Sequence, residues 1–140
     1  MKVVTFGEIM MRLQTPGHQR YIQAQSLEVE YGGGEANVAA SVANYGGDAC
    51  FVTKIPSNPI GDACMAQLRK YNICTKHIAR GGERLGIYFC EKGASQRASN
   101  VVYDRAHSSI ATAVKADFNW GEIFEGADWF HFTGITPALS

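Results

Sequence analysis

The sequence predicts an α/β fold in which a parallel sheet carries helices on both faces. Short apolar segments typical of buried strands lie at residues 3–6 and 49–53, and segments with helical periodicity lie at 34–45 and 61–71. Strands that alternate with helices in this order pair in parallel, because each helix returns the chain to the same end of the sheet. The pattern changes at residues 85–105, where two alternating segments joined by a glycine turn indicate an inserted antiparallel hairpin.

Three consecutive glycines, Gly32 to Gly34, mark the turn between an alternating strand and the first long helix. Without a Cβ, they let a ligand approach the main chain closely. The free N–H groups at the start of the helix can hold a carboxylate, a phosphate or a hydroxyl oxygen. A tight turn with no ligand explains the glycines equally well. Their spacing matches neither the dinucleotide-binding fingerprint nor a P-loop.

The helix after this turn has two apolar faces. One face carries only small side chains at helical spacing, so it can lie close against a sheet or another helix. These side chains are Ala36, Ala39, Ala40 and Ala43. The second face consists of Val38, Val42 and Tyr45, and we therefore expect the helix to be covered on two sides. Gly46 and Gly47 end it.

Two short extended segments, at residues 10–13 and 27–31, precede the glycine turn. The second alternates apolar residues with Glu28 and Glu30, which indicates a strand with one wet face. We expect both segments to join the hairpin in a small second sheet, discontinuous in sequence, that projects over the open edge of the main sheet. The remaining elements are expected to be a turn at 56–59, a helix opening at Gly61-Asp62, a short helix capped by Ser108-Ser109, a helix at 120–124, a buried strand at 129–132, a turn at 133–137 and a helix cap at Ser140.

Composition excludes several classes of function. Thirteen basic and thirteen acidic side chains cancel, which argues against binding to nucleic acid or to a membrane surface through bulk charge. There is no secretory signal and no apolar segment of the length a membrane helix needs, so we expect a cytoplasmic protein. The four cysteines, Cys50, Cys64, Cys74 and Cys90, contain no Cys-x-x-Cys pair, and we expect reduced thiols rather than a zinc site or disulfides.

Candidate binding residues lie on the hairpin and just after the first strand. Tyr103 and Arg105 share one face of an extended strand; the guanidinium suits a carboxylate or phosphate, and Tyr88 adds a hydroxyl suited to a sugar-like ligand. A rim tyrosine packed on a solvated arginine is the simpler alternative. Glu8 and Arg12 either reach the same space or form a surface ion pair.

The other polar residues indicate no catalytic machinery. Lys54 ends a strand, where a lysine usually extends to solvent. His18, His77, His107 and His131 lack metal-ligand spacing, so no metal site is expected. No Gly-x-Ser-x-Gly or His-Glu-x-x-His motif is present, and no residue is an evident general base.

Several motifs in order along the chain resemble those of the PfkB (ribokinase-like) carbohydrate kinases. They are Val3-Val4-Thr5-Phe6-Gly7-Glu8, Gly32-Gly33-Gly34-Glu35-Ala36-Asn37-Val38-Ala39, Asn58-Pro59-Ile60-Gly61-Asp62, Tyr103-Asp104-Arg105 and Thr133-Gly134-Ile135-Thr136-Pro137-Ala138-Leu139-Ser140. The chain is similar to the amino-terminal half of these enzymes. Glu35 replaces a small residue and Pro56 a glycine of many ribokinase relatives, and both are similar to the 2-keto-3-deoxygluconate kinase branch.

The resemblance implies a Rossmann-type three-layer α/β/α domain with a small β-sheet lid. Residues 1–140 would be the amino-terminal part of one such domain, with lid segments at about 10–31 and 85–105. The family pattern implies that Gly33, Gly34 and Asn37 hold substrate hydroxyls. It also implies that the lid holds the keto-acid end of the substrate. These lid residues are Tyr88, Tyr103 and Arg105, with Arg105 on the carboxylate, and Arg12 is a further substrate-binding candidate. Lids of this family pair across a homodimer.

The activity implied is transfer of the ATP γ-phosphoryl group to a sugar acid, 2-keto-3-deoxygluconate, by the full-length protein. A catalytic aspartate from a Gly-Ala-Gly-Asp-like motif, Mg²⁺ and the ATP site belong to the carboxyl-terminal half of such enzymes. Residues 1–140 contain no such motif, so we expect no catalytic residue in this chain and no kinase activity from it alone. Two alternatives stay open: a truncated, non-catalytic sugar-binding or dimerisation module, and a PfkB kinase for a neutral sugar such as fructose or for a nucleoside.

Overall fold

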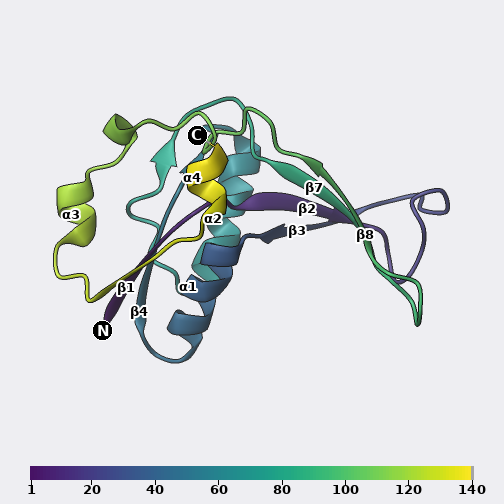
Figure 1. Ribbon diagram of the computed structural model, residues 1–140, viewed down its shortest axis with the longest axis horizontal. Coiled ribbons are helices and arrows are strands. Elements are labelled where there is room, and N and C mark those ends of the chain that lie inside the picture. Colours follow the sequence, from purple (N-terminus) through teal and green to yellow (C-terminus); the bar gives the residue numbers. More distant parts are fainter. Residues whose placement is uncertain (140) are drawn as a thin grey trace.

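A three-stranded parallel sheet forms the centre of the computed structural model, which describes residues 1–139. Its order is β4-β1-β9, with β1 (Lys2–Phe6) between β4 (Asp48–Val52) and β9 (Trp129–His131) (Figure 1). Both pairings are parallel, and Val4 lies opposite Cys50 on one side and Phe130 on the other. The predicted parallel sheet is confirmed.

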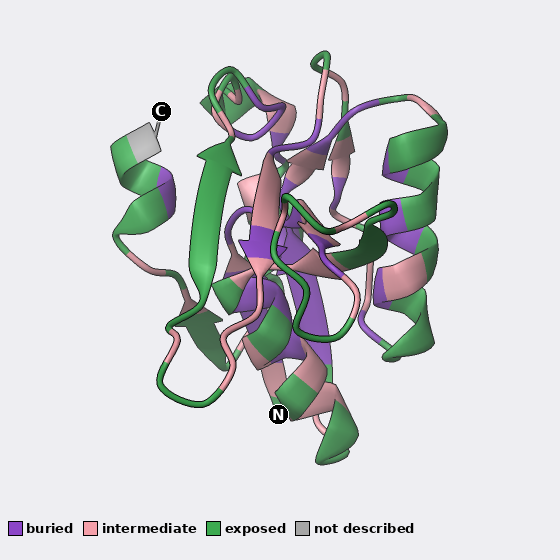
Figure 2. Ribbon diagram, turned by 90° about the vertical axis from the view of Figure 1, so that its right-hand side faces the viewer, coloured by how far each residue is buried: buried purple, intermediate pink, exposed green. Residues whose placement is uncertain are grey.

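Helices cover both faces of this sheet. Ala49 and Phe51 of β4 pack with residues of α1 (Gly34–Asn44) and α2 (Pro59–Lys70). The alternate residues Cys50 and Val52 pack on the opposite face, in a cluster that contains Ile110, Phe118 and Ile123. Ile123 belongs to α3 (Trp120–Phe124), which follows a single 3₁₀ turn (Lys115–Asp117). The strand therefore separates two cores, and buried residues concentrate around it (Figure 2).

The helix boundaries follow local chemistry. α1 ends at Asn44 because Gly46 adopts φ +80° and the Gly47 N–H returns to the Val42 carbonyl. α2 begins at Pro59, two residues earlier than predicted. The Asn58 side chain caps it by accepting hydrogen bonds from the N–H groups of Ile60 and Gly61.

A second, four-stranded sheet extends to one side of the main sheet (Figure 1), and we call it the lid sheet. Its order is β3 (Glu28–Gly32), β2 (Met10–Gln14), β7 (Ile87–Glu91), β8 (Asn100–Asp104). The β3–β2 and β7–β8 pairs are antiparallel, whereas β2 and β7 are parallel. A short parallel pair that the sequence did not indicate, β5 (Lys54–Ile55) with β6 (Ala79–Arg80), continues the chain after β4.

Two expectations about the last third of the chain are wrong. Residues 108–113 form turns and no helix, because the N–H and the hydroxyl of Ser109 both bind the Arg84 carbonyl outside the segment. A helix, α4 (Ile135–Leu139), replaces the expected turn. Pro137 lies in its first turn, where no intrahelical N–H donor is needed. The cap expected at Ser140 lies outside the described residues.

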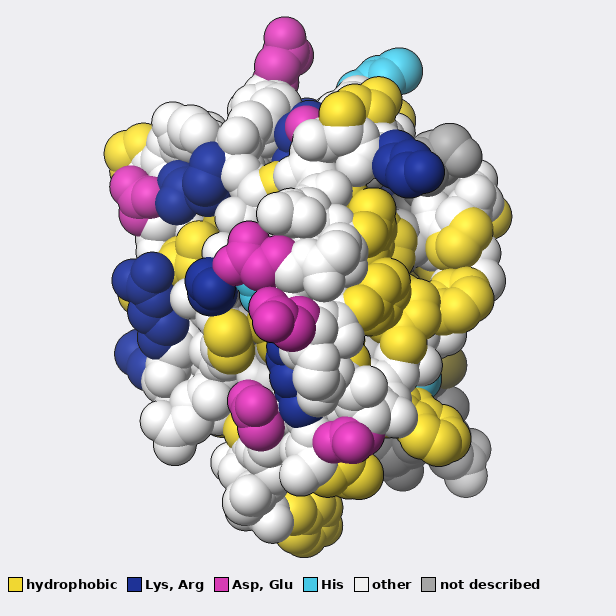
Figure 3. Space-filling view, turned by 90° about the vertical axis from the view of Figure 1, so that its left-hand side faces the viewer, with side chains coloured by type: hydrophobic (Ala, Val, Ile, Leu, Met, Phe, Trp, Pro, Cys, Tyr) yellow, Lys and Arg dark blue, Asp and Glu magenta, His cyan; other side chains and the backbone are white. Residues whose placement is uncertain are grey.

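Several side chains expected to be buried are exposed. Trp129 and Phe130 are accessible because β9 is an edge strand of the described sheet. Phe130 packs with Phe124 and Phe132 in an aromatic group, and Figure 3 shows hydrophobic side chains gathered on the face that carries α3. The second apolar stripe of α1 is only partly covered: Val42 packs against the buried core, whereas Tyr45 is 92% exposed.

All four cysteines are free, and burial raises the pKa of the Cys50 and Cys64 thiols to about 12, so both stay protonated at neutral pH. The sulfur atoms of Cys50 and Cys74 lie 3.5 Å apart. Within residues 1–139, no helix has both the length and the apolar composition that crossing a membrane requires.

Gly61 lies on the buried side of α2, where a Cβ would be 2.1 Å from the Pro56 carbonyl oxygen. We expect Gly61→Ala to lower the free energy of unfolding by about 1–3 kcal/mol through overpacking, measured by urea denaturation with tryptophan fluorescence. Gly121→Ala in α3 is the matched control, because the nearest atom lies 3.6 Å from its added Cβ. Equal stability of the two variants would contradict the packing of α2 on the turn.

Candidate functional site

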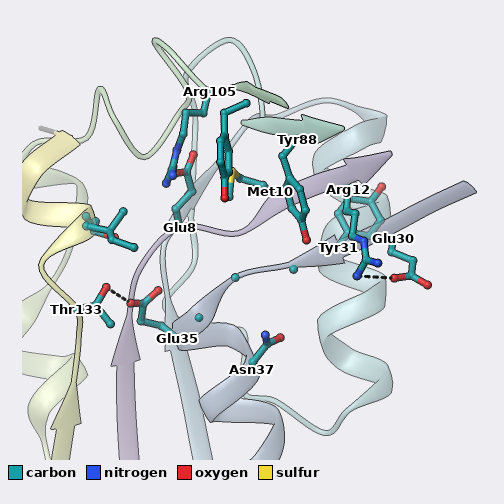
Figure 4. Close-up of a pocket in the computed structure, with 16 residues that line it drawn as sticks. Glu8, Met10, Arg12, Glu30, Tyr31, Glu35, Asn37, Tyr88, Arg105 and Thr133 are labelled. Atoms are coloured by element: carbon teal, nitrogen blue, oxygen red, sulfur yellow. Dashed lines mark hydrogen bonds and ion pairs between the residues drawn. The ribbon is translucent and has the colours of Figure 1, made fainter. Parts of the chain in front are cut away.

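A pocket of about 490 Å³ lies between the lid sheet and the amino-terminal end of α1, and the start of α4 closes one side (Figure 4). It sits beyond the carboxyl end of β1, where parallel sheets commonly bind ligands. All seven residues predicted from the sequence to bind substrate line it: Arg12, Gly33, Gly34, Asn37, Tyr88, Tyr103 and Arg105. The structure thus brings together four segments of the chain that are far apart in the sequence.

One row of side chains crosses all four strands of the lid sheet and faces this pocket. Glu30 of β3 lies opposite Arg12 of β2, Arg12 opposite Tyr88 of β7, and Tyr88 opposite Tyr103 of β8. Residues directly opposite one another point to the same face of a sheet, so the strand register alone aligns the row. The rings of Tyr88 and Tyr103 lie 6.0 Å apart between centroids.

Two of the three glycines of the turn, Gly33 and Gly34, have different roles. A Cβ on Gly33 would lie 2.1 Å from the carbonyl oxygen of Glu8, so the glycine allows two main-chain segments to touch. A Cβ on Gly34 would meet no atom within 4 Å, so this position faces open space at the pocket. Asn37, in the first turn of α1, is exposed at the base of the pocket (Figure 4).

Arg105 does not stand free in the pocket. Its Nε donates to Glu8 Oε2 at 3.0 Å, and its Nη2 contacts the same oxygen. The Ser108 hydroxyl donates to Glu8 Oε1 at 2.9 Å. The guanidinium also lies over the Tyr103 ring, 5.6 Å from its centroid. Sequence reasoning named Glu8 but missed this pairing, because the two residues are 97 positions apart.

Arg12 pairs with Glu30 rather than with Glu8, so of the two alternatives the surface ion pair between Glu8 and Arg12 is wrong, and both residues line the same pocket. Its Nη1 lies 3.4 Å from Glu30 Oε2, and its Nη2 donates to Gln14 Oε1 at 2.5 Å. The register causes this choice, because Arg12 and Glu30 are opposite one another in the antiparallel pair. Its Nε is buried and has no hydrogen-bond partner among the described residues.

Glu35 is a second buried carboxylate at the pocket. It is 5% exposed, and its Oε1 accepts a 2.6 Å hydrogen bond from the Thr133 hydroxyl. Gly7 leaves space for it, since a Cβ there would lie 2.1 Å from Glu35 Oε2. This link joins the start of α1 to the segment after β9. The sequence drew attention to Glu35 because many ribokinase relatives have a small residue at this position, but it did not indicate Thr133 as the partner.

The pocket is equipped to bind rather than to transfer protons. Burial raises the pKa of Tyr88, although nearby Arg12 opposes the shift, so the phenol stays protonated at neutral pH and can donate a hydrogen bond. Both buried carboxylates, Glu8 and Glu35, are already hydrogen-bonded. The pocket therefore offers phenols, guanidinium groups, an amide and main-chain N–H groups to a polar ligand.

Two other sequence candidates lie outside this pocket. Lys54 does not extend to solvent but pairs with Asp117 at 2.8 Å, which lowers the pKa of that carboxyl group. The histidines are scattered, and His18 Nδ1 lies 2.8 Å from the Gly93 carbonyl oxygen. Within residues 1–139, no group of histidine, cysteine and acidic side chains is arranged to hold a metal ion.

The family of the chain is decided by a match over its whole length. Residues 1–140 match the model of the pfkB family carbohydrate kinases. The chain belongs to the pfkB family. The crystal structure of a 2-dehydro-3-deoxygluconokinase from Thermotoga maritima is 62% identical and superposes with a TM-score of 0.98, over 100% of this chain and 43% of that one. The α/β class and the ribokinase-like fold are thereby confirmed.

Two further relatives of this pfkB chain bear on its function. A 2-dehydro-3-deoxygalactonokinase from Haloferax volcanii is 38% identical over 139 residues, which is 99% of this chain and 43% of that protein. A sugar kinase from Pyrococcus horikoshii, solved in complex with ATP, is 26% identical with a TM-score of 0.83, over 97% of this chain and 44% of that one. The pfkB chain thus spans less than half the length of the relatives it matches.

Substitutions of Gly33 and Gly34 are expected to have different effects in the full-length protein. We expect Gly33→Ala to lower the free energy of unfolding by about 1–3 kcal/mol, because the methyl group would collide with the Glu8 main chain. Gly34→Ala should leave stability within about 0.5 kcal/mol but weaken substrate binding about tenfold or more, since its methyl group occupies pocket space. Thermal unfolding and substrate titration separate the two effects. A stable Gly33→Ala protein would contradict the close main-chain contact.

Proposed function

We propose that residues 1–140 form the sugar-binding part of an ATP-dependent kinase for a 2-keto-3-deoxy sugar acid, with 2-keto-3-deoxygluconate as the leading substrate. The observation that carries this proposal is the convergence of all seven predicted binding residues on one pocket. Family membership and the names of two relatives support the same class of substrate.

In this proposal the two sides of the pocket hold different parts of the substrate. The main chain at Gly33 and Gly34 and the amide of Asn37 hold sugar hydroxyl groups, as exposed polar groups at a helix start can do. The phenols of Tyr88 and Tyr103 donate to the keto-acid end, and Arg105 pairs with its carboxylate. Arg12, which lines the pocket opposite Tyr88 in the sheet, lies at the same end.

The phosphoryl donor is proposed to be ATP with Mg²⁺, bound mainly by residues outside this chain. The described residues do not fit the metal, because they include no cluster of acidic, histidine or cysteine side chains that could hold it. Residues 1–140 also lack a Gly-Ala-Gly-Asp sequence for the catalytic aspartate. The ATP complex of the Pyrococcus relative supports ATP as the nucleotide.

A kinase for a neutral sugar such as fructose is the second candidate, and one observation favours it. Three glutamates and two arginines line the pocket, and both arginines already pair with glutamates: Arg12 with Glu30 and Arg105 with Glu8. A neutral sugar needs no free cation. The acidic substrate remains our first choice because Arg105 uses only one edge of its guanidinium for Glu8.

We further propose that the lid sheet pairs with that of a second copy in a homodimer. The face opposite the pocket carries an apolar row in register across the four strands, formed by Val29, Leu13, Phe89 and Val102. Val29 is 55% and Val102 50% exposed, contrary to the expectation that the apolar side of β3 is the buried one. An exposed apolar row on a sheet is suited to a partner surface.

We also propose a reducing, cytoplasmic setting for the protein, which the four free thiols support.

Arg105→Ala tests the carboxylate role in the full-length protein. We expect kcat/KM for 2-keto-3-deoxygluconate to fall by the equivalent of about 1.5–3 kcal/mol, because a charge-assisted hydrogen bond is lost. Turnover of fructose should change much less. Arg105→Lys keeps a charge beside Glu8 and controls for folding, checked by thermal unfolding. An equal loss for acidic and neutral sugars would remove the carboxylate role.

Residues 1–140 alone are predicted to have no kinase activity, because they supply binding groups without a catalytic aspartate or a metal site. An ATP-consumption assay with 2-keto-3-deoxygluconate checks this, with the full-length protein as the positive control. Saturable phosphorylation by the 140-residue chain would contradict the division of roles that we propose.

A further inference from the structure

The contact between Glu8 and Arg105 lies where the chain enters and leaves the lid sheet. Glu8 falls in the short connection between β1 of the main sheet and β2 of the lid, and Arg105 directly follows β8, the last lid strand. Figure 4 shows the two side chains together at one end of the pocket. The ion pair therefore closes the base of the lid.

Glu8 is built into this position as a buried acceptor. It is only 4% exposed, and both of its oxygens are used: Oε2 by Arg105 and Oε1 by the Ser108 hydroxyl. Gly86 provides the space, since a Cβ there would lie 2.5 Å from Glu8 Oε1 and 3.2 Å from the Arg105 Cβ. A carboxylate whose two oxygens are both engaged cannot easily reorient.

The pairing leaves one part of the guanidinium for a ligand. Glu8 takes the Nε–Nη2 edge of Arg105, whereas Nη1 makes no hydrogen bond to any described residue. The Tyr103 ring supports the guanidinium from its face. Two independent contacts thus fix the plane of the group before any ligand arrives, which reduces the entropy lost on binding.

We propose that Glu8 is a positioning residue that holds Arg105 so that its remaining N–H groups meet the carboxylate of the substrate. The proposal rests on the proposed function and adds a residue that acts through Arg105. Glu8 also neutralises part of the charge of Arg105. The geometry favours orientation as its main effect, because the guanidinium side chain is mostly buried and its N–H groups must point correctly to be useful.

Glu8→Gln in the full-length protein tests the proposal, because it keeps the size of the side chain and removes its charge. We expect KM for 2-keto-3-deoxygluconate to rise about tenfold or more, because a neutral amide holds the guanidinium less firmly than a carboxylate does, with KM for ATP unchanged. Gly86→Ala should likewise raise KM for the sugar acid and leave KM for ATP unchanged, because its methyl group would displace the Glu8 carboxylate. Glu91→Gln is the matched control: Glu91 pairs with Arg97 at 2.7 Å in the same sheet, outside the pocket, so its KM values should stay at wild type.

The outcomes separate this proposal from the proposed function. Titration of the wild-type protein shows whether a 2-keto-3-deoxy acid binds at all, and absence of binding would overturn both. If the wild type binds the acid and Arg105→Ala does not, but Glu8→Gln binds as the wild type does, only the positioning role is overturned. A lower KM in Glu8→Gln would also overturn it, since Glu8 would then compete with the substrate. A loss of thermal stability with unchanged KM would assign Glu8 a purely structural role.

Discussion

The main-chain contact between Glu8 and Gly33 is the constraint on which the site depends. A Cβ at Gly33 would lie 2.1 Å from the Glu8 carbonyl oxygen, so the strand that leads to the lid and the turn that begins α1 meet with no side chain between them. This contact brings the start of α1 beneath the lid sheet. The exposed donors of the helix and the polar row of the lid can then face one cavity.

Two buried carboxylates connect elements of the structure that are far apart in the sequence. Glu8 joins the two ends of the lid through Arg105, and Glu35 joins α1 to the segment after β9 through Thr133. A buried charge is tolerated only when it is paired and hydrogen-bonded, so each glutamate restricts its partner to one place. Both contacts lie at the pocket wall, and the same pairs that hold the elements together also set the orientation of groups that a ligand would meet.

Two apolar surfaces of the chain indicate contact with further protein. The aromatic side chains around β9 are exposed on the face that carries α3 (Figure 3), and Val29 and Val102 of the outer lid row are exposed as well, although the patterns of both segments are those of buried strands. Exposed apolar surface in register on a sheet indicates contact with further protein. For the lid we propose a second copy of the chain, because its outer row spans all four strands.

The order of residues alone determined the α/β class, the hairpin, the glycine turn and seven of the residues that line the pocket. These are properties of local periodicity, of backbone freedom and of motifs, and they can be recognised along a single chain. Only the tertiary structure decided which charges pair. Arg12 pairs with Glu30 because the strand register places them opposite one another. Arg105 pairs with Glu8, 97 positions away, because the two ends of the lid sheet meet at the main sheet. It also decided that Trp129 and Phe130 of β9, and Val29 and Val102 of the outer lid row, are exposed, since burial depends on what covers a strand and not on the composition of the strand.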